Sequence, residues 1–329
     1  MSGKHFYGGQ AVIEGVMMQA PDRWALAVRR ADGKVALYTR HHVMLSHKHR
    51  WLRLPLVRGN AALYDALATA WHGLQLSAEV AMADAAAECG SSPEQPKWML
   101  TATALLAAAL GIGLFVLLPT WATDWARAGR QLGPIANNAI EAAVRLAVIV
   151  GYIAAVGLRS EIRRIFQYHG AEHATINCYE AGEEVTPDNA LRFSTLHPRC
   201  GTSFLLTVIV VKLFVNCFLG WPVLWERMLL RIAVLPVVAG LAYEVIYFAG
   251  RRRGTVFAQA LAAPGLLLQA LTTRRPTPDQ VEVAIYALSA VAPDVPLPAN
   301  FPPPEPLPRI EHTERAKACP DLSATTGPE

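Results

Sequence analysis

Charged side chains are scarce in this sequence, at 17% of the 329 residues against 53% hydrophobic residues. Soluble domains carry about 25% charged residues. The shortage and the positive mean hydropathy of +0.25 therefore exclude an ordinary soluble enzyme and make the lipid bilayer the expected partner. The formal net charge is only +4. Without a basic helix or a platform of aromatic and basic side chains, the sequence gives no indication of nucleic-acid binding.

Cysteine is also sparse, and the five cysteines are odd in number and scattered along the chain. This pattern excludes a disulfide framework. The N-terminus opens with polar residues such as Lys4 and His5, so it lacks the apolar core of a cleaved signal peptide.

The N-terminal region, residues 1–59, is expected to contain a β-hairpin. Two alternating runs, 24–30 and 35–42, flank Asp32-Gly33, and Asp-Gly between such runs is a strong hairpin signal. Upstream of them, Glu14 stands alone in an apolar stretch. It could point into a site, but a loop carboxylate that accepts backbone hydrogen bonds is the slightly favoured interpretation.

Residues 60–88 are predicted to form an amphipathic helix that packs on the hairpin or lies at the bilayer surface. Its apolar positions recur at helical spacing: Leu63, Leu67, Trp71 and Leu74. A linker rich in serine and proline ends this 60–97 segment. A basic cluster precedes the helix, and its spacing fits no ligand pattern, so a solvated surface facing the membrane is favoured over a second metal site. The cluster comprises His41, His42, His47, Lys48, His49 and Arg50.

Four apolar segments lie in the expected membrane domain, residues 98–275, and predict a mainly α-helical membrane protein. A helix of about 20 apolar residues crosses the hydrocarbon core. The segments are Trp98–Trp121, Ala139–Leu158, Thr202–Trp221 and Met228–Ala249. The second helix is expected to continue past the bilayer through His169.

Arginine and lysine accumulate in the 159–201 loop and directly after the fourth segment, while the 120–138 and 222–227 loops hold few. The positive-inside rule therefore places both termini and the 159–201 loop in the cytoplasm.

Three further elements are expected beyond the fourth segment. Residues 255–271 are apolar but short, and Pro264-Gly265 divides them, so they predict a re-entrant or interfacial helix pair. Residues 276–292 predict a short cytoplasmic helix. The tail, 293–329, is dense in proline and lacks periodicity, which predicts disorder.

The residues best suited to chemistry lie in the 159–201 loop. His169 and His173 are four residues apart, so on a helix they share one face and could bind one metal ion. Glu172 lies beside them, in the His-x-x-Glu-His order of reversed zincins. His197 and Cys200 follow in a His-x-x-Cys turn. Together they predict a metal site, although the histidines could instead form hydrogen bonds in a packed helix at the membrane surface.

Several stretches together resemble the YqhQ-like family of bacterial multi-pass membrane proteins, described as predicted metal-dependent enzymes. The resemblance covers about residues 5–290 and implies a bacterial cytoplasmic (inner) membrane location, but no substrate. Its candidate site residues correspond to His169, Glu172, His173, His197, Cys200 and Glu244. The stretches that carry it are Gly8–Met18, Phe166–His173, Phe193–Phe204, Leu235–Glu244 and Pro264–Gln269.

The third metal ligand is open at this stage. In reversed-zincin peptidases a glutamate further along the chain completes the site, and Glu244 lies 71 residues beyond His173. A carboxylate in its apolar run is costly unless it is paired, metal-bound or hydrated, so Glu244 could instead pair with an arginine such as Arg199. The alternative ligands are His197 and Cys200.

Two functions follow. With Glu244 or His197 as the third ligand, an open position would remain for water, so the site would suit a hydrolase with Zn²⁺ as cofactor and Glu172 as the catalytic base. With His197 and Cys200, the site would be closed and would suit a non-catalytic membrane scaffold or assembly factor. A transporter is less favoured, because four spans are few for one unless the chain forms a homo-oligomer.

Overall fold

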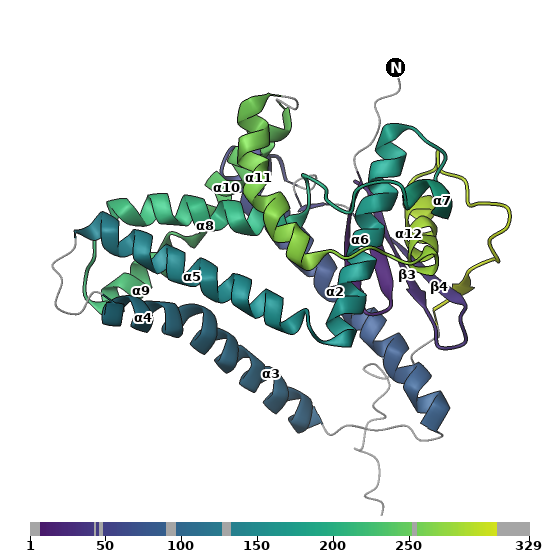
Figure 1. Cartoon of the computed structure of the whole chain (residues 1–329), viewed down its shortest axis with the longest axis horizontal. Helices are drawn as coiled ribbons and strands as arrows, with labels where there is room; N and C mark the ends of the chain where they lie inside the picture. Colours follow the sequence, from purple (N-terminus) through teal and green to yellow (C-terminus); the bar gives the residue numbers. More distant parts are fainter. Residues whose placement is uncertain are drawn as a thin grey trace, which may run out of the picture.

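The structure is a computed structural model that describes residues 7–42, 44–45, 49–89, 97–126, 133–251 and 255–307. Within these ranges the chain is mainly helical. It forms a small sheet covered by helices, next to a bundle of apolar helices (Figure 1).

Five strands form one sheet in the order β1-β2-β3-β4-β5, antiparallel except for the parallel pair β4–β5. The strands are β1 Gly8–Val12, β2 Gly15–Gln19, β3 Arg23–Arg29, β4 Val35–His41 and β5 Glu305–Pro306. The predicted hairpin is confirmed as β3–β4, and Gly33 in its turn has a φ of +84°, which glycine adopts without steric cost. The β1–β2 hairpin is an element that the sequence analysis does not predict.

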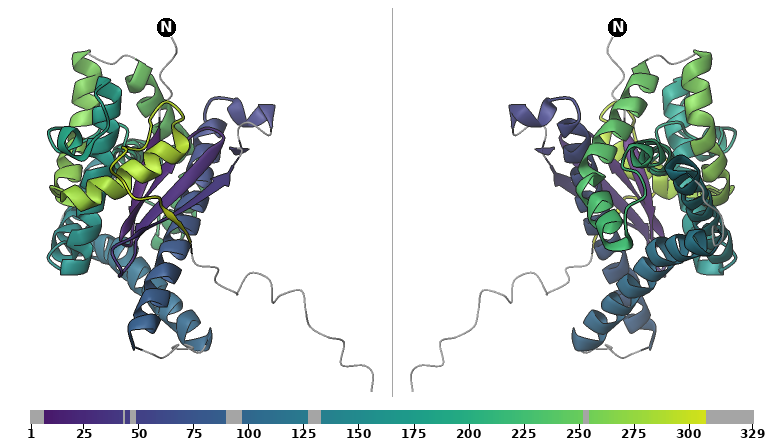
Figure 2. Two further views of the ribbon diagram at one scale, coloured as in Figure 1. Left: turned by 90° about the vertical axis from the view of Figure 1, so that its right-hand side faces the viewer. Right: turned by 90° about the vertical axis from the view of Figure 1, so that its left-hand side faces the viewer.

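Both faces of the sheet are buried against helices. Val16 and Met18 in β2 pack toward α6 (Ser160–Ala181) and α12 (Pro278–Val291). Met17, which points the other way, packs with Val80 of α2 (Val57–Cys89). Figure 2 shows these helices on the two sides of the purple strands. Because successive side chains along a strand point to opposite faces of the sheet, each strand contributes to two separate hydrophobic cores.

The C-terminal segment is more ordered than expected. The helix α12 is a central element of the core, and most of its side chains, such as Ile285, are fully buried. The disorder predicted from residue 293 onward is wrong for 293–307: Tyr179 donates a hydrogen bond to Asp294 (2.8 Å), and Lys34 pairs with Glu305 of β5 (2.6 Å). The proline content and the lack of periodicity predicted disorder, but contacts with residues distant in the sequence hold this segment in place.

The predicted helix at 60–88 exists as α2, but its bulky apolar stripe does not face the sheet. Small and polar side chains, including Thr69 and Ser77, are buried instead. The exposed large side chains are Tyr64, Leu67, Trp71, Leu74 and Met82.

The remaining helices, apart from the one-turn 3₁₀ helix η1 (Arg50–Arg53) and the short α7 (Pro187–Ala190), form the bundle. They are α3 Lys97–Ile112, the π-helical turn η2 Gly113–Leu117, α4 Leu118–Ala126, α5 Pro134–Val156, α8 Gly201–Phe218, α9 Leu224–Ala233, α10 Leu235–Arg251 and α11 Val256–Thr272. The helix α11 runs unbroken through Pro264, so the expected division into two helices is not present. A proline removes only one helical hydrogen bond.

Membrane association is supported by two helices of the described residues that are long and apolar enough to cross a bilayer, 105–126 and 134–156. A third span results if α9 and α10, which meet at a bend of 48°, count as one. The apolar part of α8, Leu206–Phe218, is shorter than a span, so the four predicted spans are not all found.

The second apolar segment does not continue into the histidine helix. The helix α5 ends at Val156, and α6 begins at Ser160 after Arg159, whose backbone is extended. Figure 1 shows α6 turned away from the direction of α5 and lying against the sheet. The histidines therefore belong to the sheet-containing unit.

Some expectations concern residues outside the described ranges. They are the linker at 90–96, His47 and Lys48 of the basic cluster, Arg252 and Arg253 after the fourth segment, and the tail at 308–329.

Candidate metal centre

The helix α6 carries His169, Glu172 and His173 in its buried middle part and ends at Gly182, which has the left-handed φ of +81° common at helix C-termini. The two imidazoles lie one turn apart, with ring centroids separated by 4.4 Å. The predicted shared face is therefore present.

His169 is oriented by the end of α11. Its Nδ1–H donates to the carbonyl of Thr272 (2.9 Å), because a carbonyl can only accept. The lone pair of Nε2 is then left facing Cys200 Sγ at 3.2 Å. Gly170 permits this approach, because a Cβ at that position would lie 2.0 Å from the carbonyl oxygen of Arg274.

His173 is arranged in the same way but is more deeply buried. Its Nδ1–H donates to the carbonyl of Thr195 (2.6 Å), and its Nε2 is buried without a hydrogen-bond partner. Burial lowers the pKa of His173, although the nearby Cys200 thiol opposes the shift; the lowered pKa favours the neutral ring that a metal ion needs. The thiol does not reach Nε2 at the distance of a normal hydrogen bond, so a bound cation would satisfy this buried lone pair better.

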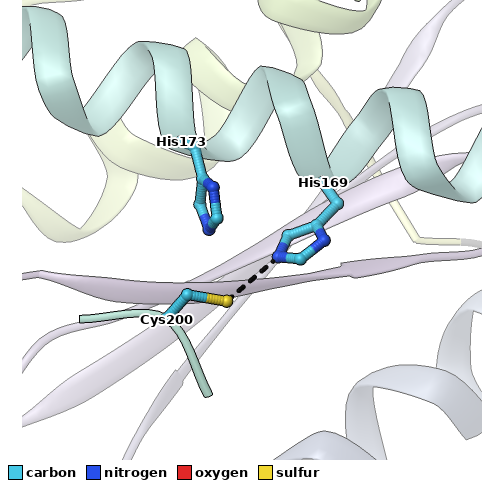
Figure 3. Close-up of side chains that lie close together, drawn as sticks. All are labelled: His169, His173 and Cys200. Carbon is cyan, nitrogen blue, oxygen red and sulfur yellow. Dashed lines mark hydrogen bonds between the residues drawn. The ribbon is translucent and has the colours of Figure 1, made fainter. Parts of the chain in front are cut away.

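Cys200 directly precedes α8 and completes the group (Figure 3). One ligand atom from each of His169, His173 and Cys200 lies within 4.8 Å of the other two. Ligand atoms around a tetrahedral Zn²⁺ are separated by about 3.3–3.8 Å, given bonds of 2.0–2.3 Å, so a small contraction would fit the ion. A backbone carbonyl orients each imidazole, as is usual for metal-binding histidines.

Glu172 lies beside this group, buried against the sheet. Its side chain fills the space next to Gly9 in β1, where a Cβ would lie 2.9 Å from the Glu172 carboxyl carbon. Burial raises the pKa of Glu172 to about 7, although the neighbouring His169 and His197 oppose the shift. Its Oε2 is buried and has no hydrogen-bond partner.

His197 is adjacent to the group but bound elsewhere. Its ring contacts Arg199, whose backbone N–H donates to Nδ1 (3.3 Å) and whose guanidinium lies 3.3 Å from Nε2. Glu180 pairs with Arg199 and lies 3.7 Å from the same Nε2. Gln269 of α11 fixes the backbone of His197 with two hydrogen bonds. The closed set of three histidines and one cysteine is therefore not assembled.

Glu244 is not brought to the histidines. Its carboxylate accepts hydrogen bonds from Arg58 Nε (2.8 Å) and from the Leu56 backbone N–H (3.2 Å). The expected pairing with an arginine is present, but the partner is Arg58 of α2 and not Arg199.

Glu14, like Glu244, forms its ion pair outside the metal group. It sits in the β1–β2 turn with a φ of +52°, and its carboxylate accepts from Arg164 and from the hydroxyl of Tyr168 (3.2 Å) on α6. It therefore ties the turn to the histidine helix and does not enter the metal group.

Comparison with known proteins identifies the family of the chain. The family model described as "Protein of unknown function (DUF1385)" matches residues 54–294. The chain is 36% identical over 295 residues to the "Uncharacterized protein YqhQ" of Bacillus subtilis (strain 168), covering 86% of this chain and 91% of that protein. No solved structure matches. The chain is therefore a member of the DUF1385 family, to which the resemblance in its motifs points.

Proposed function

We propose that this protein is a metal-dependent hydrolase, most simply zinc-dependent, that acts at the cytoplasmic face of a bacterial membrane. The observation that carries the proposal is the convergence of two imidazole Nε2 atoms and one thiol on the same small volume. The Nε2 of His173 is buried there without a partner.

The ligand set supports a catalytic site more than a structural one. His169, His173 and Cys200 would hold the ion, and three protein ligands leave a fourth position open. Zn²⁺ held by these residues would supply Lewis acidity and would lower the pKa of water toward neutral pH.

Glu172 is the candidate catalytic base. Burial raises the pKa of its carboxyl group, and a base whose pKa lies near the working pH is the most effective at taking a proton and returning it. The side chain lies away from bulk water, so its proton would be exchanged with a reactant inside the site.

Metal content tests the ligands. Purified protein should carry about one zinc ion per chain, and His173→Ala and Cys200→Ser should each lose most of it. The matched control is Cys217→Ser, because Cys217 is a free cysteine of α8 that does not belong to the group. If the wild type carries no metal and shows no thermal shift with Zn²⁺, the metal site is rejected.

The second candidate is a scaffold whose metal has a structural role, and one observation favours it. The group joins α6 to the start of α8 and the end of α11, as a structural staple would. Glu172→Gln separates the two functions, because it keeps the size and removes the base. If the protein is a hydrolase, the Glu172→Gln variant should keep its metal but should not restore function to a strain that lacks the protein. If the variant keeps its metal and restores function fully, the hydrolase is rejected and the scaffold function remains.

We also propose that the chain is a multi-pass protein of the bacterial cytoplasmic membrane with both termini inside. The asymmetry of arginine and lysine between the loops supports this orientation. Reporter fusions at positions 130, 190 and 224 should score outside, inside and outside. An external signal at position 190 would contradict the orientation and place Cys200 in an oxidising compartment.

A further inference from the structure

A cavity of about 580 Å³ lies between η1, the first turns of α2 and α10. Its volume is within the range of about 300–1,000 Å³ that is typical of ligand sites. The cavity is separate from the candidate metal centre, because none of its lining residues belongs to α6, α8 or α11. The lining residues with polar side chains are Gln19, Arg53, Arg58, Asp65 and Tyr243.

Three of these side chains offer hydrogen-bond donors that no described residue engages. Arg58 holds Glu244 with Nε and Nη2, so the two N–H groups of its Nη1 are available. The Gln19 amide and the Tyr243 hydroxyl also line the cavity and form no hydrogen bond within the described part of the chain. Guanidinium, amide and hydroxyl donors are the groups that bind phosphate oxygens.

Asp65 places an acceptor in the same cavity. Its side chain is only 9% exposed, and its Oδ2 accepts from the Leu45 backbone N–H (2.8 Å). For Oδ1, the described residues offer only the imidazole of His42, whose Nε2 lies 3.8 Å away, too far for a hydrogen bond. A buried carboxylate oxygen without a donor is costly, and a primary ammonium group would satisfy it.

The chain beside the cavity presents apolar side chains to the surroundings. Trp51, Leu54 and Leu56 are all exposed, Trp51 by 60%. Arg50 and Arg53 flank Trp51 in η1, and Figure 2 shows the segment around η1 standing out beside the strands. Tryptophan is enriched at the membrane–water interface, and arginine there keeps its charged end among the headgroups.

The helix α10 holds this segment in an unfavourable backbone conformation. Leu56 has a left-handed φ of +67°, which residues other than glycine rarely adopt. Its backbone N–H is bound by Glu244, and its carbonyl oxygen lies where a Cβ at Gly240 would be 2.5 Å away. Such strain persists only where the surrounding structure fixes it, as at ligand sites. The exposed apolar segment is therefore fixed next to the cavity.

We propose that this cavity binds the headgroup of a membrane phospholipid that carries a primary amine, phosphatidylethanolamine. Arg58, Gln19 and Tyr243 would hold the phosphate, and Asp65 would hold the ammonium group. The acyl chains would lie against the exposed side chains of the 51–56 segment. A zwitterionic headgroup matches a cavity with both guanidinium and carboxylate groups, whereas an anionic headgroup would offer Asp65 no cation.

Thermal unfolding of the full chain in detergent tests the headgroup. Short-chain phosphatidylethanolamine should raise Tm by several degrees in a saturable manner, because a ligand that binds only the folded state stabilises it. Phosphatidylcholine of the same chain length should act more weakly, because its quaternary ammonium group has no N–H to donate to Asp65. Phosphatidylglycerol should also act more weakly, because it carries no cation. Equal responses to the three lipids, or a preference for either of the other two, would overturn the proposal.

Two conservative variants assign the binding groups. Tyr243→Phe removes one phosphate donor, so it should weaken the response to all three lipids. Asp65→Asn keeps an acceptor for the Leu45 N–H but removes the charge, so the preference for phosphatidylethanolamine should disappear. The matched control is Tyr64→Phe, since Tyr64 is an exposed tyrosine of α2 that does not line the cavity, and it should respond like the wild type. If Tyr243→Phe and Asp65→Asn also respond like the wild type, the site is rejected. The lipid preference of the wild type decides the matter if either variant does not fold.

O-phosphoethanolamine distinguishes a membrane lipid from a soluble phosphate ester. It carries the same phosphate and amine without acyl chains, so it should stabilise the wild type only at a much higher concentration than the lipid. If it acts at the same concentration as the lipid, the cavity binds a soluble phosphate ester and the lipid assignment is wrong.

Discussion

Two glycines determine where the side chains of the candidate metal centre can lie. Gly170 lets the backbone at Arg274 approach α6, so that His169 reaches a carbonyl of α11. Gly9 leaves the space in β1 that the Glu172 side chain fills. Neither glycine binds anything, but each sets the position of a functional neighbour through the absence of a Cβ atom.

Gly9→Ala should therefore disturb Glu172 without removing a metal ligand. The new methyl group would overlap the Glu172 side chain and the Met17 carbonyl, and overpacking of this kind costs about 1–3 kcal/mol. We expect a lower free energy of unfolding, retained zinc and weakened complementation. The control is Gly8→Ala, because no atom lies within 4 Å of a Cβ at Gly8. Identical behaviour of the two variants would contradict the assigned role of Gly9.

At the residue scale, spacing along one helix was sufficient to pair His169 with His173, since both lie on α6. Spacing could not choose among the remaining ligands. Cys200 joins the histidines while His197, three residues earlier, is held by Arg199 and Gln269. These choices depend on contacts between distant segments, to which a single sequence gives no direct access.

At the scale of elements, two helices bury their polar side chains and expose their apolar ones. The helix α9 buries Arg227 and Arg231, and its large apolar side chains point outward. The helix α2 buries Asp65 and Thr69 under an exposed apolar stripe. This inversion is expected where the surroundings are lipid, because polar groups then have partners only inside the protein.

The exposed stripe of α2 should therefore contact lipid. Trp71 is 61% exposed and Trp24, on the sheet, only 3%. In variants that retain one or the other tryptophan alone, brominated lipids in nanodiscs should quench the fluorescence of Trp71 strongly and that of Trp24 weakly. Equal quenching, or none of Trp71, would place α2 away from the bilayer.

The same helix is joined to the predicted hairpin by an ion pair. Asp84 accepts hydrogen bonds from Arg30 Nε (3.0 Å) and from the Ala31 backbone N–H (2.9 Å) in the β3–β4 connection. Burial alone would raise the pKa of Asp84, but these hydrogen bonds hold it below its ordinary value. The carboxylate therefore stabilises the fold above about pH 4, and this contribution is lost as the pH falls through the lowered pKa.

Asp84→Asn should reduce the free energy of unfolding at pH 7 by about 1.5–3 kcal/mol, the usual contribution of hydrogen bonds to a charged group. It should also flatten the loss of stability below pH 4, since the titrating group is gone. Denaturant unfolding between pH 3 and pH 7 measures both effects. Asp32→Asn, in the exposed turn beside it, is the control and should change little.

Local signals therefore predicted the elements that local contacts form. Asp32-Gly33 specifies the β3–β4 turn by its own backbone preference. The β1–β2 turn at Glu14 has no such signal, because the left-handed residue there is a glutamate held by Arg164 and Tyr168. The strand β5 could not be predicted from local signals either, because it forms only by pairing with β4, which lies far away in the sequence.

At the scale of the whole molecule, the candidate metal centre lies at the junction of the two parts. His169 and His173 belong to the sheet-containing unit, while Cys200 leads into α8 and Thr272 ends α11. A metal ion held there would link the unit to the bundle in the hydrolase and in the scaffold alike.

Metal removal should therefore loosen the junction before it unfolds either part. A ligand present at 100 times its Kd stabilises the state that binds it by about 2.7 kcal/mol, so chelation should lower Tm measurably. Hydrogen exchange should then rise first in the backbone around Thr195, whose carbonyl holds His173, while the core of α12 stays protected. Glu244→Gln is the control, because Glu244 pairs with Arg58 and not with the histidines: its variant should still respond to chelation. If chelation left both Tm and the exchange of the 194–200 segment unchanged in metal-loaded protein, the ion would not join the two parts, and the scaffold function would lose its physical basis.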